Sequence, residues 1–316
     1  MKTKKLLLCV AAGALLVSCA KEKDKTLSVD TNTITANKEA GTYKIAVTSN
    51  TEWSVFVDDA TWYEIYPLRG SDNGNIYVVI QNNPTDTDRN VTINIQTTTL
   101  KETITLTQEG IVVPENGVLV DGVVWAKTNV DAFGTFAATP DALGRSYQFN
   151  DTVGYKAVSQ NGVTWTLEPE WKDVEWEKME AGYIWQPDKD PCPTGWRIPT
   201  GDEVWSLANS SATFYSAVDG WFFGPNSASA TWSDFKGCVF LPIIVKEIIN
   251  GDVWTTTGEY AYGNYGIGYW ASNAISINDR GYMRLTNLCL YYDHPFVMPR
   301  ITTPSKYAFS IRCVKE

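Results

Sequence analysis

The chain has 316 residues, which predicts about two domains, and its 36 acidic against 26 basic side chains give a net charge of -10. The negative charge excludes a protein that binds nucleic acid through a basic face, so we expect no nucleic-acid partner. The single histidine, His294, excludes a zinc site with two histidine ligands in this chain, and it permits a Ser-His-Asp triad only with itself as the base. We therefore expect no enzyme, no cofactor and no metal ion.

The N-terminus is typical of an export signal. Three of the first five residues are lysines, and residues 6–17 form an apolar run of twelve residues. A run of that length is too short to span a bilayer and fits a secretory signal peptide.

The apolar run leads into the sequence LVSC, whose last residue is Cys19. This sequence resembles a bacterial lipobox, which implies that residues 1–18 are a lipoprotein signal peptide and that Cys19 is lipidated. The alternative is an ordinary signal peptide cut near Ala20. Residues 19–26 are polar and are predicted to form a tether. Because acyl chains hold a protein on a membrane, we expect an outer-membrane lipoprotein displayed on the cell surface.

Residues 27–110 alternate apolar and polar positions with the period of two that is typical of β-strands. The apolar positions fall into runs separated by turn residues: Tyr43, Ile45 and Val47; Trp53, Val55 and Val57; Ile76, Val78 and Ile80; Val91, Ile93 and Ile95; and Ile104 and Leu106. Short strands at this spacing predict an all-β sandwich. Trp53 shares its strand face with two valines, so we expect its ring to lie in the core.

The same segment carries further landmarks in a fixed order: Trp53, Trp62, the glycines Gly70 and Gly74, Asn82 and Asn83 before Arg89, and Gln108 to Gly110. This pattern resembles the BACON family, and the resemblance implies an immunoglobulin-like sandwich over residues 27–110. Carbohydrate binding has been proposed for BACON domains. We expect a spacer here, because the sequence shows no cluster of exposed rings beside carboxylates, and sugar binding is the alternative.

Residues 111–116 are predicted to be a linker, and residues 117–316 carry a second set of sequence blocks. They are GVLVDGVVWAKTNVDAFGTFAATPDALGRSYQFND, DPCPTGWRIPTGDEVWSLAN, GYWASN and YAFSIRCVKE. Cys192, Gly195, Trp196 and Arg197 fall in the pattern CPxGWRxPT of the second block. The blocks resemble the FISUMP family, the Fibrobacter succinogenes major paralogous domain, and the resemblance implies an α+β C-type-lectin-like fold for residues 117–316.

A helix is predicted directly after that second block. Thr200 can cap its N-terminus, and Glu203 three residues later completes a capping box. The helix would bury one face through Val204, Trp205, Leu207 and Ala208. For Trp196 and Arg197 we expect packing and an internal hydrogen bond rather than ligand contact.

Beyond the signal region the chain has four cysteines, Cys192, Cys238, Cys289 and Cys313. Four cysteines allow three pairings, and the sequence alone does not choose among them. The lectin-like resemblance implies that Cys192, near the first helix, pairs with Cys313 on the last strand. Cys238 and Cys289 lie in strand-like apolar runs, and they either form a second disulfide or remain buried thiols.

Loop residues between 258 and 300 are rich in tyrosine, glycine, serine and asparagine, a composition that resembles an antibody paratope. The predicted ligand-binding residues are Tyr260, Tyr262, Asn264, Tyr265, Asn273, Asn278, Asp279, Tyr291, Tyr292, Asp293, Phe296 and Arg300. Tyr269 and Trp270 fall where the FISUMP family has a core Tyr-Trp motif, so we expect both to be structural.

These observations lead to one hypothesis and two alternatives. The hypothesis is a membrane-anchored, non-enzymatic recognition or adhesion protein that binds a glycan or a host-surface protein through its C-terminal loops. The alternatives are a structural or tip subunit of a surface fibre and an accessory protein of a polysaccharide-utilisation system. A calcium site at residues 186–188 is not expected, because the Gln-Pro-Asp there lacks the later Trp-Asn-Asp that calcium-dependent galactose lectins carry.

Overall fold

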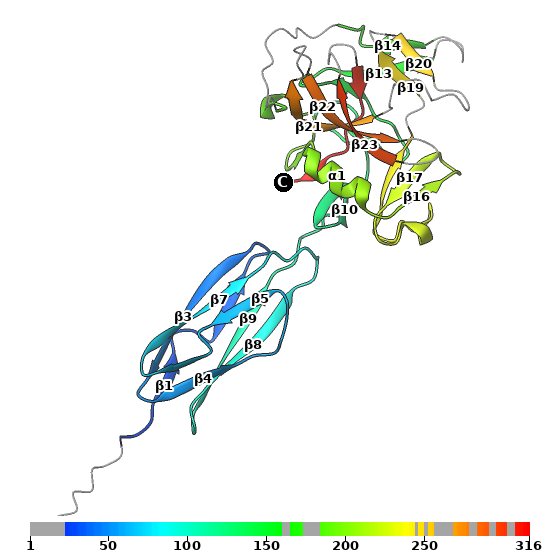
Figure 1. Ribbon diagram of the computed structural model, residues 1–316. Coiled ribbons are helices and arrows are strands. Elements are labelled where there is room, and N and C mark those ends of the chain that lie inside the picture. Colours follow the sequence, from blue (N-terminus) through cyan, green and yellow to red (C-terminus); the bar gives the residue numbers. More distant parts are fainter. Residues whose placement is uncertain are drawn as a thin grey trace, which may run out of the picture. The chain divides into compact units, whose positions relative to one another are not determined.

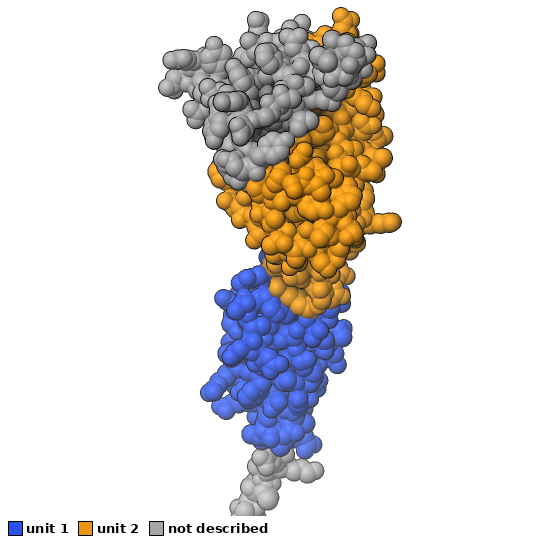
Figure 2. Space-filling view, turned by 90° about the vertical axis from the view of Figure 1, so that its right-hand side faces the viewer, with its two compact units in different colours: residues 1–36, 40–81, 90–107 blue, residues 37–39, 82–89, 108–316 orange. Residues whose placement is uncertain are grey.

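The computed structural model describes residues 23–159, 165–172, 184–243, 246–249, 252–255, 268–277, 283–290, 295–301 and 307–316. The chain divides into two compact units, which Figure 2 shows in separate colours. Unit 1 contains residues 1–36, 40–81 and 90–107, and unit 2 contains residues 37–39, 82–89 and 108–316. None of the helices in the described part of the chain is long and apolar enough to cross a membrane.

Unit 1 is built from two sheets packed face to face (Figure 1). The first has the strand order β1-β3-β7-β5, from Leu27–Val29, Gly41–Ser49, Gly74–Ile80 and Tyr63–Tyr66. The second has the order β2-β9-β8-β4-β6, from Thr33–Ala36, Lys101–Gln108, Arg89–Gln96, Glu52–Phe56 and Arg69–Ser71.

Alternate side chains of both sheets point inward and form one apolar core, because successive residues of a strand face opposite sides. The predicted all-β sandwich is thereby confirmed. Trp53 lies in this core with 2% of its surface exposed, as predicted, and its indole N–H donates to the carbonyl oxygen of Asp72 at 2.9 Å. Trp62 is half-buried and meets Tyr63 edge-on.

Unit 2 arranges its described strands in four sheets. The sheet β10-β11-β25-β15 joins Gly117–Val120, Val123–Ala126, Val314–Lys315 and Trp196–Arg197. The sheet β14-β13-β12-β24-β19-β20 joins Trp165–Glu168, Gly154–Ser159, Ser146–Gln148, Tyr307–Phe309, Lys246–Ile249 and Asp252–Thr255. The two three-stranded sheets are β16-β17-β18, from Ala212–Tyr215, Gly220–Phe223 and Val239–Pro242, and β21-β22-β23, from Gly268–Ile277, Met283–Leu290 and Pro295–Ile301.

Helix α1, Gly201–Asn209, packs beside the β21-β22-β23 sheet (Figure 1), and two short 3₁₀ helices span Pro187–Lys189 and Ser227–Ser229. The predicted capping box is present. Val204 and Leu207 are buried, but Trp205 is 45% exposed, so the prediction that Trp205 belongs to the buried face was wrong. One residue turns a helix by about 100°, which carries Trp205 away from the stripe of its neighbours.

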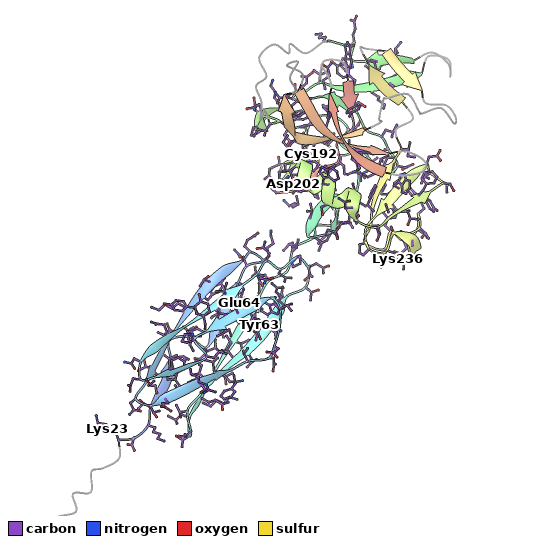
Figure 3. All side chains as sticks on the ribbon, in the orientation of Figure 1. Lys23, Tyr63, Glu64, Cys192, Asp202 and Lys236 are labelled. Atoms are coloured by element: carbon purple, nitrogen blue, oxygen red, sulfur yellow. A yellow bond between two sulfur atoms is a disulfide. The ribbon has the colours of Figure 1, made fainter. Side chains whose placement is uncertain are left out.

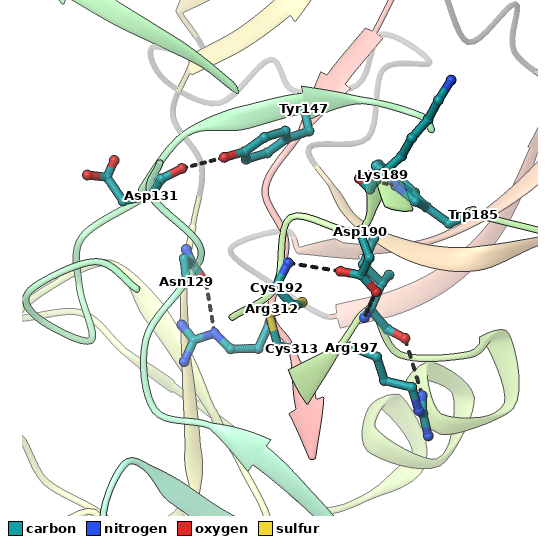
Figure 4. Close-up of a disulfide and its surroundings, with 11 residues drawn as sticks. Asn129, Asp131, Tyr147, Trp185, Lys189, Asp190, Cys192, Arg197, Arg312 and Cys313 are labelled. Atoms are coloured by element: carbon teal, nitrogen blue, oxygen red, sulfur yellow. Dashed lines mark hydrogen bonds between the residues drawn. A yellow bond between two sulfur atoms is a disulfide. The ribbon is translucent and has the colours of Figure 1, made fainter. Parts of the chain in front are cut away.

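The disulfide Cys192–Cys313 is formed and joins the loop before α1 to the last strands, as the lectin-like resemblance implied. Around it (Figure 4), the Asp190 carboxylate accepts the backbone N–H groups of Cys192 and Ile198, each at 2.9 Å. Burial raises the pKa of Asp190, although these two hydrogen bonds oppose the rise. Asp190 thus ties both sides of the cysteine-containing loop together.

A buried arginine lies close to the disulfide. The Arg312 guanidinium donates to Asn129 Oδ1 at 2.8 Å (Figure 4). It also donates to the carbonyl oxygen of Ala126 at 3.0 Å. Arg312 is 1% exposed, and burial lowers its pKa to about 10. Tyr269 and Trp270 are 3% and 1% exposed, which confirms that both are structural.

Cys238 is a buried free thiol, so the possible second disulfide with Cys289 is not formed. Burial raises the pKa of the Cys238 thiol, which keeps it protonated and unreactive. Of the two alternatives left open by the sequence, the buried thiol is the one found for Cys238.

Candidate functional site

Most of the predicted ligand-binding residues lie outside the described residues. They are Tyr260, Tyr262, Asn264, Tyr265, Asn278, Asp279, Tyr291, Tyr292 and Asp293. Cys19 also lies outside them. The predicted C-terminal loop site and the predicted lipidation therefore stay predictions.

The three remaining residues lie in strands, which corrects their placement in loops. Asn273 is in β21, and Phe296 and Arg300 are in β23. The loop placement rested on composition, which does not show strand pairing. β23 accommodates the prolines at 295 and 299 because it is an edge strand of its sheet, where missing N–H donors are tolerated.

Asn273 also has a structural task that the sequence did not indicate. Its side-chain oxygen accepts the backbone N–H of Gly201, the first residue of α1, at 2.7 Å. The first N–H groups of a helix lack partners within the helix, so this bond satisfies one of them. Asn273 therefore holds the start of α1, and its predicted ligand contact stays a prediction.

Unit 1 presents a better-defined candidate on the outer face of the sheet β1-β3-β7-β5. The strand register places Lys44 opposite Tyr77 and Tyr77 opposite Tyr66, which makes one row across three strands. The next row is Thr42, Val79 and Glu64. We call these six residues the tyrosine face; Figure 3 labels Glu64 on β5.

The two rings of the tyrosine face form a pair. Their centroids are 5.8 Å apart with planes inclined by 30°, and Tyr66 is 50% exposed. Cross-strand aromatic pairs of this kind stabilise a sheet, so the pair is fixed by the register rather than loosely placed. The face therefore offers a pre-ordered aromatic surface.

Polar groups flank the rings. Lys44, Thr42 and Glu64 are exposed, and within the described residues none of these three side chains makes a hydrogen bond or an ion pair. A sugar ring needs an apolar surface for its C–H groups and polar partners for its hydroxyls. The tyrosine face has both, with Lys44 and Glu64 on different strands around the ring pair.

This finding corrects the expectation that unit 1 has no exposed rings beside carboxylates. The sequence could have indicated this surface, because successive residues of a strand point to opposite faces of the sheet. Tyr77 stands between the buried Ile76 and Val78, and Tyr66 is three positions from the buried Tyr63, so both must point outward.

Residues 51–109 match the model of the BACON family. Its description is "Putative binding domain, N-terminal", and the match includes Glu64, Tyr66, Tyr77 and Val79. The resemblance read from the sequence is confirmed for this segment. Thr42 and Lys44 precede it.

Other comparisons find only distant likeness. A search of curated proteins finds no matching sequence. Among solved structures, a Bacteroides ovatus GH5 xyloglucanase in complex with a XXXG heptasaccharide has 12% identity and a TM-score of 0.26, and the match covers 45% of this chain but only 30% of that one. A protein from Bacteroides thetaiotaomicron, solved by NMR, has 13% identity and a TM-score of 0.22, covering 30% of this chain and 96% of its own. Scores this low say nothing about the function of this chain.

Proposed function

We propose that this chain is a membrane-tethered, non-enzymatic recognition protein whose ligand is a glycan. The observation that carries the proposal is the tyrosine face, where a fixed ring pair lies among unpaired polar side chains in a segment that matches a binding-domain family. Lipidation of Cys19 would supply the tether, with the protein displayed on the cell surface.

The proposal extends to unit 2. We propose that residues 117–316 form a FISUMP-like domain with a C-type-lectin-like fold. The capped helix after the cysteine-containing loop and the disulfide from that loop to the last strands support it. The C-terminal loops predicted from the sequence would then add ligand contacts of their own.

The test is a glycan array probed with residues 20–316. The Tyr66→Ala/Tyr77→Ala variant should bind at least about fivefold more weakly, since two stacked rings at about 0.5–1.5 kcal/mol each contribute about 1–3 kcal/mol beyond their buried area. Phe56→Ala is the matched control, because Phe56 is an exposed ring of unit 1 (54%) on the other sheet, and it should bind within about twofold of the wild type.

Three other outcomes would contradict parts of the proposal. Unchanged binding by a folded double-tyrosine variant would contradict the tyrosine face, and loss of binding in a Tyr262→Ala/Tyr291→Ala variant would move the site to the C-terminal loops. No binding to any glycan would contradict the ligand class and favour a subunit of a surface assembly.

A further inference from the structure

A second aromatic feature lies in unit 2, at a tight turn before β18. Residues 231–234 form this turn, closed by hydrogen bonds between Thr231 and Asp234 in both directions, at 2.9 and 3.1 Å. The Asp234 N–H is also 3.2 Å from Thr231 Oγ1. Trp232 is therefore held on a short backbone segment with little freedom.

The Trp232 ring rests on a base of phenylalanines. Its centroid lies 5.5 Å from Phe235 and 5.3 Å from Phe240, and the Phe240 contact is edge-on. Phe240 is buried and packs in turn on Phe222, which is 0% exposed. This base fixes the plane of the indole before any ligand arrives, which lowers the entropic cost of binding.

The indole nevertheless remains open to solvent. Trp232 is 36% exposed, and its N–H donates no hydrogen bond within the described residues. Buried tryptophans of the chain behave differently: the indole N–H of Trp185 donates to the Lys189 carbonyl and that of Trp270 to the Tyr147 carbonyl. Trp232 thus presents both a ring surface and a free donor.

The surroundings of Trp232 are polar and electrically balanced. Ser229 and Ser233 are exposed hydroxyls, and Asn226 is an exposed amide. Asp234 forms an ion pair with Lys236, and Figure 3 labels the lysine. Within residues 226–237, Trp232 is the one large apolar side chain that is exposed.

We propose that Trp232 is the stacking platform of a second glycan-binding site, selective for neutral hexoses. A pyranose ring would place its C–H face on the indole, and one of its hydroxyl oxygens would accept the indole N–H. Its other hydroxyls would contact Ser229, Ser233 or Asn226. Selectivity for a neutral sugar follows because Asp234 and Lys236, the charged side chains within residues 226–237, are paired with each other. The ligand class of this site rests on the proposed function.

The experiment measures Trp232 directly in the Tyr66→Ala/Tyr77→Ala background, where the tyrosine face no longer contributes. The probes are cellohexaose and mannohexaose, with a chondroitin sulfate hexasaccharide as the anionic comparison. The indole N–H resonance of Trp232, assigned by its absence in Trp232→Phe, should shift with either neutral probe and stay in place with the anionic one.

Affinity provides the second readout. Trp232→Ala should weaken neutral binding at least about fivefold, and Trp232→Phe, which keeps the ring base packed, should weaken it by less. Trp205→Ala is the matched control, since Trp205 is an exposed tryptophan of unit 2 on α1, and it should bind within about twofold of its background.

The two proposals fail in different ways. An unmoved Trp232 resonance, or full binding by folded Trp232→Ala, overturns the second site even if the tyrosine face binds glycans in the otherwise unmodified chain. If the unmodified chain binds no saccharide at all, both proposals are overturned.

Discussion

The Trp53 indole leaves room for only the smallest residue at two positions of unit 1. A β-carbon added to Gly70 would lie 2.2 Å from Trp53 Cζ2, and one added to Gly74 would lie 2.9 Å from the same atom. The turn between β6 and β7 therefore wraps the ring closely and offers it the Asp72 carbonyl as a hydrogen-bond acceptor. The glycine-rich turn is explained by the size of this one side chain.

Gly70→Ala should accordingly destabilise unit 1 by about 1–3 kcal/mol, the usual cost of forcing an extra carbon into a packed core. Hydrogen exchange of the β4 amides in the full chain would measure this loss, because it reports on unit 1 separately from unit 2. Gly41→Ala is the control: its added carbon would meet Tyr43 at an ordinary 3.4 Å. Equal protection in both variants would show that Trp53 can move aside.

At the scale of elements, α1 is fixed by contacts from both near and far in the sequence. Glu203 Oε2 accepts the Thr200 N–H at 2.7 Å, and Arg197 donates to both carboxylate oxygens at 2.8 and 2.6 Å. Burial alone would raise the pKa of Glu203, but the hydrogen bonds from Arg197 and Thr200 hold it below its ordinary value. The expected internal hydrogen bond of Arg197 is therefore present.

This lowered pKa makes the helix contribution depend on pH. Ionised Glu203 stabilises unit 2 above the pKa of the unfolded chain, about 4.3, and the stabilisation is lost as pH falls through the lower folded value. Glu203→Gln should cost about 1.5–3 kcal/mol at pH 7 and much less near pH 3. Urea titrations at both pH values would measure the difference.

The control for that experiment is Asp202→Asn. Asp202 is the exposed neighbour in the same helical turn (Figure 3), and its side chain makes no hydrogen bond or ion pair within the described residues. Its replacement should cost less than about 1 kcal/mol. A Glu203→Gln penalty that is the same at pH 7 and pH 3 would contradict the role assigned to the ionised carboxylate.

The elements that could be predicted from sequence are those determined by neighbouring residues. The capping box needs only Thr200 and Glu203, and the core strands of unit 1 follow from a period of two. The role of Asn273 could not be predicted, because its partner Gly201 is 72 positions away. The tyrosine face could be predicted in part. The sequence of each strand shows which way its tyrosine points, but only the strand register shows that Tyr66 and Tyr77 lie side by side.

At the scale of the whole molecule, the two units are stabilised differently. Unit 1 has one continuous apolar core between its sheets. Unit 2 divides its apolar side chains among several clusters, and it also contains a disulfide between residues separated by 121 positions. A cross-link that closes so long a loop restricts the unfolded chain strongly and is worth about 4–5 kcal/mol in the chain-entropy model.

Removal of this cross-link should therefore affect one unit only. In a Cys192→Ala/Cys313→Ala variant, or in the wild type under a thiol reductant, the free energy of unfolding of unit 2 should fall by about 4–5 kcal/mol in that model. The free energy of unfolding of unit 1 should stay unchanged. Peptide-level hydrogen exchange of the full chain would compare β8 and β9 with β17 and β18. Cys238→Ala is the control, because it removes a buried thiol without opening the loop. If both units lose protection equally, they unfold as one, and glycan binding by the tyrosine face should also disappear in reductant. If only unit 2 loses protection, the units are independent, and that binding should survive reduction.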